Sequence, residues 1–367
     1  MRIAQISPLM EAVPPKLYGG TERIVAYLSD ALVAMGHDVT LFASGDSVTT
    51  ATLAPACPRA LRVDPTIRDH IAPLMAMLET VAQRAGEFDI IHLHCDYLGY
   101  SALRRTGTPF LATLHGRLDL PELRPLYGVF SNVPVVSISD AQRAPLPQAR
   151  FIATIPHGLP ERLLLPGSGA GGYLAFLGRI SPEKRADRAI AIARAAGLPL
   201  KIAAKVDRVD EAYFHAEIKA LLRQPGVEFI GEIDDRHKNA FLGQARALLF
   251  PIDWPEPFGL SMIEAMACGT PVLAYGHGAV PEVVDEGVTG AIVHTMDEAT
   301  SRVQSVLALD RVQVRRRFEQ RFTVARMARD YVEIYKSLIG TPKKRETGVP
   351  ASGRAMSGNG HGELLTG

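Results

Sequence analysis

Two glutamates lie eight positions apart in the segment Glu256-Pro257-Phe258-Gly259-Leu260-Ser261-Met262-Ile263-Glu264. The segment follows an apolar run at 247–250, which predicts a buried parallel strand, and it leads into a helical pattern that Gly269 ends. A glycine-bearing loop between a strand and a helix leaves backbone N–H groups and the positive end of the helix dipole facing an anionic ligand. A carboxylate on each side adds acceptors for sugar hydroxyls. This arrangement predicts a nucleotide-sugar site.

Two other turns carry groups suited to a phosphate. The sequence Gly19-Gly20-Thr21-Glu22 opens a predicted helix, where glycines let a backbone approach a phosphate; a flexible loop with a threonine N-cap is the alternative. Arg179 and Lys184 bracket a turn at the end of another predicted strand. Two cations there would neutralise a leaving diphosphate without a metal ion, and an ordinary solvated pair is the alternative.

Three histidines and Glu264 each allow two interpretations. His115 ends a predicted strand on the ligand-binding side, although a lone histidine is more often structural than catalytic. His92 and His94 share one strand face, and because no partner lies at a recognisable ligand spacing we favour packing over metal binding. Glu264 follows Ser261 by three positions, so the two residues also fit a capping box, in which the glutamate bonds the Ser261 N–H.

The composition restricts the class of protein. A length of 367 residues predicts two domains, and 47% hydrophobic with 22% charged residues is typical of a globular protein. The net charge of +1 gives no reason to expect nucleic acid as a partner. The three cysteines are far apart, and we see neither a signal peptide nor an apolar run long enough to span a membrane. We therefore expect a cytoplasmic protein. Peripheral contact with the inner face of the membrane stays open.

Short apolar runs alternate with helical patterns along the chain, which predicts an α/β fold with two doubly wound parallel sheets in series. Ligands of such sheets bind beyond the carboxyl ends of the strands, so we expect the site in the cleft between the domains. Residues 167–172 match G-x-G-x-x-G but precede a strand, so we interpret them as a linker. The run Arg315-Arg316-Arg317 is interpreted as a solvated helix face, and residues 341–367 as a disordered tail. The predicted strands are 2–7, 38–43, 90–94, 109–115, 133–139 and 151–155, then 173–177, 200–205, 227–230, 247–250, 271–275 and 291–293.

In this order, the motifs resemble those of the retaining glycosyltransferases of family 4, which have the two-domain GT-B fold. The likeness covers roughly residues 1–340 and is strongest over 256–272, with further matches at 176–184, 281–290 and 321–331. It implies Rossmann-like domains over 1–155 for the acceptor and 156–325 for the nucleotide-sugar donor. A helix over 326–340 would cross back to the first domain.

The resemblance also implies roles for the matching residues. The diphosphate and sugar of the donor would be held by Gly20, Arg179, Lys184, Phe258, Gly259 and Leu260. Glu264 would bind the nucleotide ribose, which favours this role over the capping box. Glu256 would lie against the donor sugar and His115 near its C6 side. These two residues, with Arg179 and Lys184, form the expected catalytic set.

Members of this family transfer a sugar with retention of its anomeric configuration and need neither a metal nor another cofactor. We therefore expect a hexosyltransferase that uses a nucleoside-diphosphate sugar and the hydroxyl of a glycan, a lipid-linked sugar or a small molecule. The sequence does not identify the base, the sugar, the acceptor or the oligomeric state. Two segments depart from the usual family pattern, His157-Gly158-Leu159-Pro160 and Ala203-Ala204-Lys205. These departures affect what the resemblance implies about the base pocket and the linker contacts.

Three alternatives compete with this interpretation. A sugar-nucleotide 2-epimerase has the same architecture, but we find no acid/base set for it. A non-catalytic scaffold that binds nucleotide sugars would not need every active-site position to be filled. A dehydrogenase that uses NAD would need its glycine fingerprint after a strand, and here it precedes one.

Overall fold

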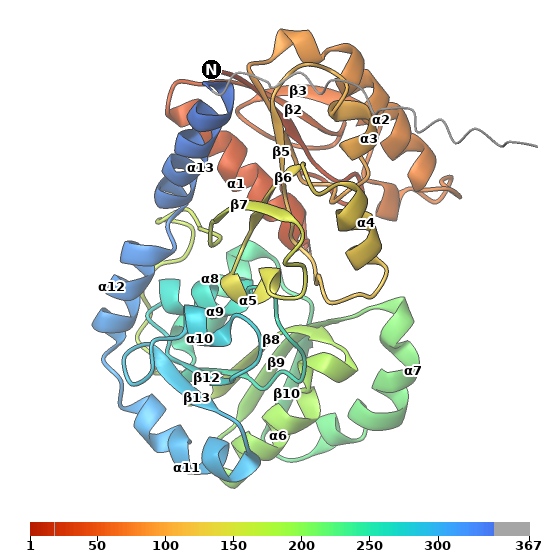
Figure 1. Cartoon of the computed structure of the whole chain (residues 1–367). Helices are drawn as coiled ribbons and strands as arrows, with labels where there is room; N and C mark the ends of the chain where they lie inside the picture. The colour runs from red at the N-terminus through yellow and green to blue at the C-terminus, as the bar shows by residue number, and fades with distance from the viewer. Residues whose placement is uncertain (18, 341–367) are drawn as a thin grey trace, which may run out of the picture.

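The computed structural model of the protein describes residues 1–17 and 19–340, so the predicted tail 341–367 lies outside the described residues. The chain forms two parallel sheets with helices on their faces (Figure 1). This confirms the predicted α/β class with two Rossmann-like, doubly wound sheets. The seven-stranded sheet, with its helices, is called the N-terminal lobe, and the six-stranded sheet the C-terminal lobe.

In the N-terminal lobe the strand order is β3-β2-β1-β4-β5-β6-β7, and every pair is parallel. The order reverses beside β1, which lies between β2 and β4. The carboxyl ends of β1, β4 and β5 therefore lie where ligands of such sheets bind. The strands are β1 Arg2–Ile6, β2 Asp38–Ser44, β3 Thr52–Cys57, β4 Ile90–Leu93, β5 Phe110–Thr113, β6 Pro134–Ser137 and β7 Arg150–Thr154. The helices are α1 Gly20–Ala34, α2 Ile71–Gln83, α3 Tyr100–Leu103, α4 Leu123–Val129 and α5 Asp140–Arg143.

The C-terminal lobe repeats this plan with the order β10-β9-β8-β11-β12-β13, again with parallel pairs. Here the order reverses beside β8, so the turns after β8 and β11 correspond to those after β1 and β4. The strands are β8 Leu174–Ile180, β9 Leu200–Val206, β10 Val227–Gly231, β11 Ala247–Phe250, β12 Val272–Tyr275 and β13 Gly290–Val293. The helices are α6 Ala186–Ala195, α7 Glu211–Tyr213, α8 Asp235–Gln244, α9 Leu260–Ala267, α10 Val280–Val283, α11 Met296–Leu307 and α12 Arg311–Arg321.

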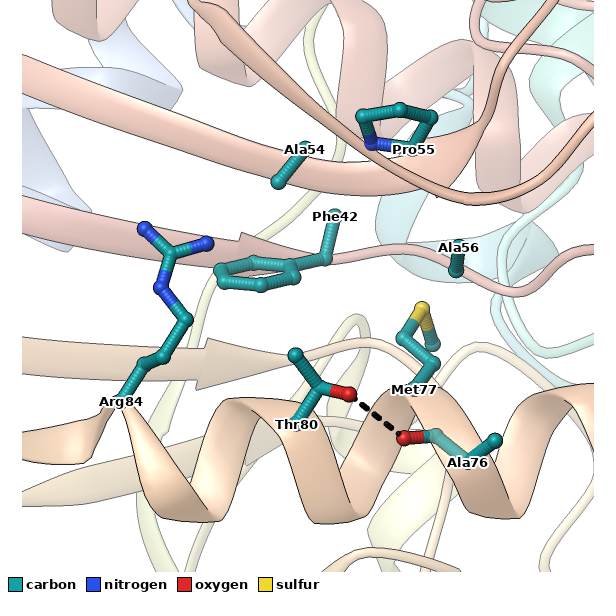
Figure 2. A pocket seen from close by; sticks show the side chains of 8 residues that line it. All are labelled: Phe42, Ala54, Pro55, Ala56, Ala76, Met77, Thr80 and Arg84. Atoms are coloured by element: carbon teal, nitrogen blue, oxygen red, sulfur yellow. Dashed lines mark hydrogen bonds between the residues drawn. The ribbon is translucent and has the colours of Figure 1, made fainter.

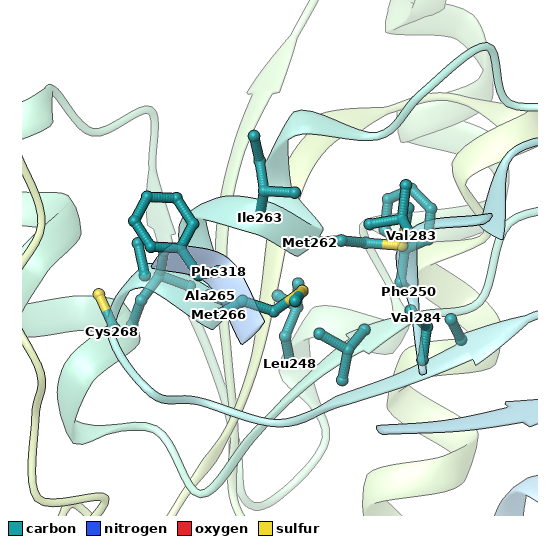
Figure 3. Close-up of a cluster of buried hydrophobic side chains, with 14 of the residues drawn as sticks. Leu248, Phe250, Met262, Ile263, Ala265, Met266, Cys268, Val283, Val284 and Phe318 are labelled. Carbon is teal, nitrogen blue, oxygen red and sulfur yellow. The ribbon is translucent and has the colours of Figure 1, made fainter. Parts of the chain in front are cut away.

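Helix α9 is held rigidly in the core of the C-terminal lobe. Its residues 262–267 are all buried, and Figure 3 shows Met262, Ile263 and Met266 in a cluster with Leu248 of β11 and Phe318 of α12. The guanidinium of Arg315 donates to the carbonyl oxygen of Ala267 at 2.5 Å. This places a cation at the negative end of the α9 dipole, so the predicted solvated face is wrong for Arg315.

The last helix, α13 Val324–Ile339, returns to the N-terminal lobe, as predicted. It runs beside α1 (Figure 1), and its apolar stripe packs in one cluster with Ile3 of β1 and Leu28 of α1. Tyr331 and Tyr335 are buried in this interface. No helix within residues 1–17 and 19–340 has the length and apolar character needed to cross a membrane.

Candidate functional site

The loop between β11 and α9 has the predicted strand–glycine–helix form. Helix α9 begins at Leu260, and its N-cap residue is Gly259, with φ of 89°. A β-carbon on Gly259 would lie 2.5 Å from Cε of Met262, so this backbone conformation and contact require glycine. Within the described chain no side chain caps α9, so no side chain competes with a ligand for the backbone N–H groups at its amino end. The N–H of Met262 bonds the carbonyl oxygen of Gly259 at 3.0 Å.

The amino end of α1 meets that of α9 across the two lobes. Helix α1 begins at Gly20, which contradicts the alternative of a threonine N-cap at Thr21. A β-carbon on Gly20 would lie 3.4 Å from Cδ1 of Leu260. Two helix amino ends, one from each lobe, therefore lie together at this point.

Lys184 and Glu256 form a close, mostly buried ion pair. Nζ of Lys184 lies 2.5 Å from Oε2 of Glu256, and the two side chains are 17% and 10% exposed. The same oxygen accepts a hydrogen bond from Nε1 of Trp254 at 3.0 Å. Nζ also lies 4.9 Å from the centroid of the Trp254 ring, within the range of a cation–π contact. Trp254 was not among the predicted site residues, although it is the only tryptophan and precedes Glu256 by two positions.

Arg179 is the second cation at the end of β8. Its Nη2 donates to Oε1 of Glu183 at 2.6 Å, and its Nε lies 3.3 Å from Oδ2 of Asp210. Burial raises the pKa of Asp210, although the Arg179 charge opposes this. Both predicted diphosphate ligands are thus paired with carboxylates and are not ordinary solvated cations.

Glu264 is buried and bonds a lysine, not its own helix. Its Oε1 accepts from Nζ of Lys238 at 2.6 Å, and Nζ also lies 3.2 Å from Oδ1 of Asp235. Asp235 in turn pairs with Arg23 of α1, so these charges cross between the lobes. The capping-box interpretation is wrong because the N-cap is Gly259 and Ser261 lies inside the helix.

Backbone contacts clamp the loop that carries Glu256. A β-carbon on Gly278 would lie 2.3 Å from the carbonyl oxygen of Glu256, which also accepts from the N–H of Ala279 at 2.9 Å. From the N-terminal lobe, Oγ of Ser139 donates to the carbonyl oxygen of Pro257 at 2.7 Å. Both lobes therefore fix the same turn. The carboxylate of Glu282 adds to this link, because it accepts from two backbone N–H groups of the N-terminal lobe, at 140 and 141, at 2.7 Å each.

His115 belongs to a cluster of four neutral histidines. Its Nε2 lies 2.8 Å from Nδ1 of His94, and its ring stacks on that of His157 with centroids 5.3 Å apart. The His157 ring stands edge-on to Phe258 at 5.0 Å, which connects the cluster to the loop between β11 and α9. Burial lowers the pKa of His115 to about 3 and those of His92, His94 and His157 well below their ordinary value.

The ring nitrogens of His92 and His94 all have partners in the protein. His92 bonds the hydroxyls of Tyr335 and Thr113 at 2.7 Å each. His94 bonds Gln5 and His115 at 2.8 Å each. This supports the packing interpretation of these two histidines.

A cavity in the N-terminal lobe lies outside this site. Figure 2 shows its lining from β2, β3 and α2, with Arg84 as the charged residue and a hydrogen bond from Thr80 to the Ala76 carbonyl at 2.9 Å. The residues that line it, as described, include none of the predicted site residues. They are Phe42, Ala54, Pro55, Ala56, Ala76, Met77, Thr80 and Arg84.

Two family profiles match successive parts of the chain. The family described as "Glycosyltransferase Family 4" matches residues 18–196, and "Glycosyl transferases group 1" matches residues 169–322. With the two facing lobes and the loop at their boundary, these matches define a glycosyltransferase of GT-B fold. The chain belongs to glycosyltransferase family 4.

Several known proteins are similar over most of their length. Phosphatidyl-myo-inositol mannosyltransferase of Propionibacterium freudenreichii is 28% identical over 325 residues, which are 79% of this chain and 81% of the relative. The crystal structure of AviGT4, a glycosyltransferase involved in avilamycin A biosynthesis, aligns with a TM-score of 0.71 at 25% identity, covering 92% of this chain and 98% of AviGT4. Anabaena HepE in complex with UDP-glucose shares the fold, with a TM-score of 0.69 at 19% identity over 92% of this chain and all of HepE.

Proposed function

We propose that the protein transfers a hexose from a nucleoside-diphosphate sugar to an acceptor hydroxyl, with retention of the anomeric configuration and without a metal or other cofactor. The observation that carries the proposal is the approach of the amino end of α1 to that of α9, where a β-carbon on Gly20 would lie 3.4 Å from Cδ1 of Leu260. A β-carbon on Gly259 would lie 3.5 Å from Cγ of Glu256, and Glu256 pairs with Lys184. Backbone N–H groups, a cation and a carboxylate therefore lie around one point between the lobes.

The diphosphate would be the group that these charges stabilise. Arg179 and Lys184 would exchange their carboxylate partners for phosphate oxygens, and the N–H groups of the first turn of α9 would bind the phosphate nearer the sugar. Releasing Glu256 from Lys184 would free its carboxylate to accept hydrogen bonds from sugar hydroxyls. Glu264 would accept from the ribose hydroxyls once Lys238 shifts.

The reaction would then proceed on one face of the sugar. The bond between the anomeric carbon and the phosphate oxygen breaks, the acceptor oxygen bonds the same face of that carbon, and its proton passes to the departing phosphate. Such a step needs charge stabilisation and positioning more than a protein base. His115, being neutral, would orient the sugar by hydrogen bonding and would not transfer a proton.

The comparisons support the substrate class at a coarse level. The relative from P. freudenreichii is a mannosyltransferase, and HepE was crystallised with UDP-glucose, so we propose a hexose and a nucleoside diphosphate. We assign no single base or acceptor. We propose that the reaction takes place in the cytoplasm and that any contact with the membrane is peripheral.

Trp254 provides a direct binding assay. Trp254 is the only tryptophan, and its Nε1 bonds Glu256 at 3.0 Å. Its fluorescence should therefore change when a donor binds. Titration with UDP-, GDP- and ADP-sugars should give a saturable change for the true donor. Product NMR in the presence of EDTA should then show transfer at an undiminished rate and the same anomer as in the donor. An inverted product, or loss of activity in EDTA, would refute the mechanism.

Substitution of Arg179 tests the diphosphate role, and two further assays distinguish a transferase from an epimerase and a scaffold. Arg179→Ala should lower the turnover number by about 100-fold or more, whereas Arg194→Ala, on the exposed side of α6, should leave it unchanged. An Arg179→Ala variant with normal turnover would reject the diphosphate role. Conversion of a nucleotide sugar to its 2-epimer by the isolated protein would indicate an epimerase, and donor binding without turnover of any acceptor would indicate a scaffold.

A further inference from the structure

A row of buried polar side chains connects the last helix of the chain to His115. Nε2 of the Gln5 amide donates to the hydroxyl oxygen of Tyr335 at 3.2 Å. The amide oxygen Oε1 of Gln5 lies 2.8 Å from Nε2 of His94, and Nδ1 of His94 lies 2.8 Å from Nε2 of His115. The row therefore runs from α13 through β1 and the end of β4 to the end of β5.

Gln5 fixes the direction of every hydrogen bond in this row. Its amide oxygen can only accept, so the proton of neutral His94 is on Nε2 and its Nδ1 is bare. A bare Nδ1 can only accept in turn, so neutral His115 carries its proton on Nε2. The remaining nitrogen of His115, Nδ1, is then an acceptor. Because burial lowers the pKa of both rings far below neutrality, each ring holds one proton under physiological conditions.

The other groups around the row follow from the orientation of the Gln5 amide. The Tyr335 hydroxyl accepts from Gln5, so its own proton is available to Nδ1 of His92 at 2.7 Å. Nε2 of His92 then carries a proton and donates to Oγ1 of Thr113 at 2.7 Å. If the Gln5 amide were turned over, each of these bonds would reverse and His115 would carry its proton on Nδ1.

Nδ1 of His115 ends the row, and in the described part of the chain nothing bonds it. The atom is buried and has no hydrogen-bond partner within residues 1–17 and 19–340. Buried polar atoms are rarely left in this state unless a ligand or water completes them. The ring lies between His94 and the stacked His157, and His157 makes an edge contact with Phe258 in the loop between β11 and α9.

We infer that Gln5 and Tyr335 are positioning residues that hold His115 as the Nε2-protonated tautomer, so that Nδ1 accepts a hydrogen bond from a hydroxyl of the donor sugar. The identity of the ligand rests on the proposed function, whereas the tautomer is a property of the protein alone. This row makes His115 select a sugar that presents a hydroxyl donor at that position. A donor with hydrogen or fluorine there loses the bond.

The tautomer can be measured directly by NMR. Long-range proton–nitrogen spectra of protein labelled with ¹⁵N-histidine distinguish bare from protonated ring nitrogens, and a His115→Asn variant assigns the His115 signals. The wild-type protein should show a bare Nδ1 on His115. Gln5→Met, which keeps the length of the side chain but removes both hydrogen bonds, and Tyr335→Phe, which releases the Gln5 amide, should each convert His115 to a mixture of tautomers.

Two matched variants control for a merely structural effect. Tyr331→Phe removes a buried hydroxyl from the same face of α13, but that hydroxyl bonds Thr113 at 2.8 Å and stands outside the row, so the His115 tautomer should not change. Gln5→Glu keeps an acceptor opposite Nε2 of His94 and should preserve the tautomer.

The kinetics should follow the tautomer. Gln5→Met and Tyr335→Phe should lower kcat/KM about tenfold with the natural donor, as expected for one lost hydrogen bond. They should have little effect with a donor that lacks the hydroxyl. A wild-type His115 protonated on Nδ1, or a tautomer unchanged by Gln5→Met, would overturn the inference. Failure of the proposed function would instead appear as absence of sugar transfer with the tautomer results intact.

Discussion

Lys184 has two roles that paired substitutions can separate. In the structure its ammonium neutralises the buried carboxylate of Glu256 at 2.5 Å, and in the proposed reaction it binds the diphosphate. Lys184→Met removes both roles and leaves the Glu256 charge with Trp254 as its neutral donor. Glu256→Gln in the same protein then removes the unpaired charge but does not restore the cation.

The burial of the pair sets the expected magnitudes. With side chains only 17% and 10% exposed, removing one partner should lower the free energy of unfolding by about 3–5 kcal/mol. The double variant Lys184→Met/Glu256→Gln should return to within about 1 kcal/mol of the wild type, because neither charge is left unpaired. The transfer rate should fall by about 100-fold or more in both proteins, because both lack the cation that stabilises the leaving group.

Denaturant unfolding followed by circular dichroism gives the stability, and initial rates at saturating donor give the activity. The exposed pair Lys201–Glu228 is a matched control, with its ions 3.0 Å apart and side chains 36% and 56% exposed. Lys201→Met should change stability by at most about 1 kcal/mol and leave the rate unchanged. If the double variant regained its rate together with its stability, Lys184 would act only as the partner of Glu256 and the diphosphate role would be rejected.

Three further predictions concern a buried acid, a glycine and an arginine. Burial raises the pKa of Glu22 from 4.5 to about 7, so its contribution to the free energy of unfolding is largest below pH 4.5 and is lost as the pH rises through 7. The stability that Glu22→Gln gains over the wild type should therefore grow by about 2–3 kcal/mol between pH 5 and pH 8. A difference in denaturant unfolding that stays constant over this range would contradict the prediction. Gly278→Ala, at φ of 59°, forces the Glu256 loop to move and should weaken donor binding about tenfold in calorimetric titration. The control Gly287→Ala has φ of 72° but meets no atom of the described chain within 4 Å, so normal binding is expected there and equal weakening would refute the steric argument. Arg311→Met removes hydrogen bonds to four backbone carbonyls and should destabilise the protein by about 3 kcal/mol or more in denaturant unfolding; a loss below 1 kcal/mol would show that these carbonyls find other partners.

The strands could be predicted where the sheet is buried on both faces, and one was missed where it is not. Strands such as β11 and β12 are buried at every position and read as continuous apolar runs. β3, by contrast, is the edge of its sheet and is half-exposed. Its apolar residues are mostly small and are interrupted by Pro55, so the segment Thr52–Cys57 does not have the pattern of a buried strand.

The strand–glycine–helix form of the loop between β11 and α9 could be predicted because Glu256–Glu264 are nine consecutive residues directly after a buried strand. Its partners could not be predicted, because they come from distant segments that no spacing rule connects. The choice between the two roles of Glu264 depends on Lys238, which is 26 positions away. Gln5 and Tyr335, which are 330 positions apart, carry no local signal of a shared hydrogen bond.

The return of α13 to the N-terminal lobe affects the order in which the molecule can be made. Val324 is synthesised about 170 residues after Thr154, which ends the sheet that α13 covers. At about 5–20 residues per second, roughly 10–35 s pass between the two events on a ribosome. During that interval Ile3 and Leu28 lack the apolar side chains of α13, and Gln5 lacks the hydroxyl of Tyr335. The N-terminal lobe is therefore completed last. A chain that stops before α13 would expose the apolar surface that α13 covers, and the His115 tautomer would no longer be fixed.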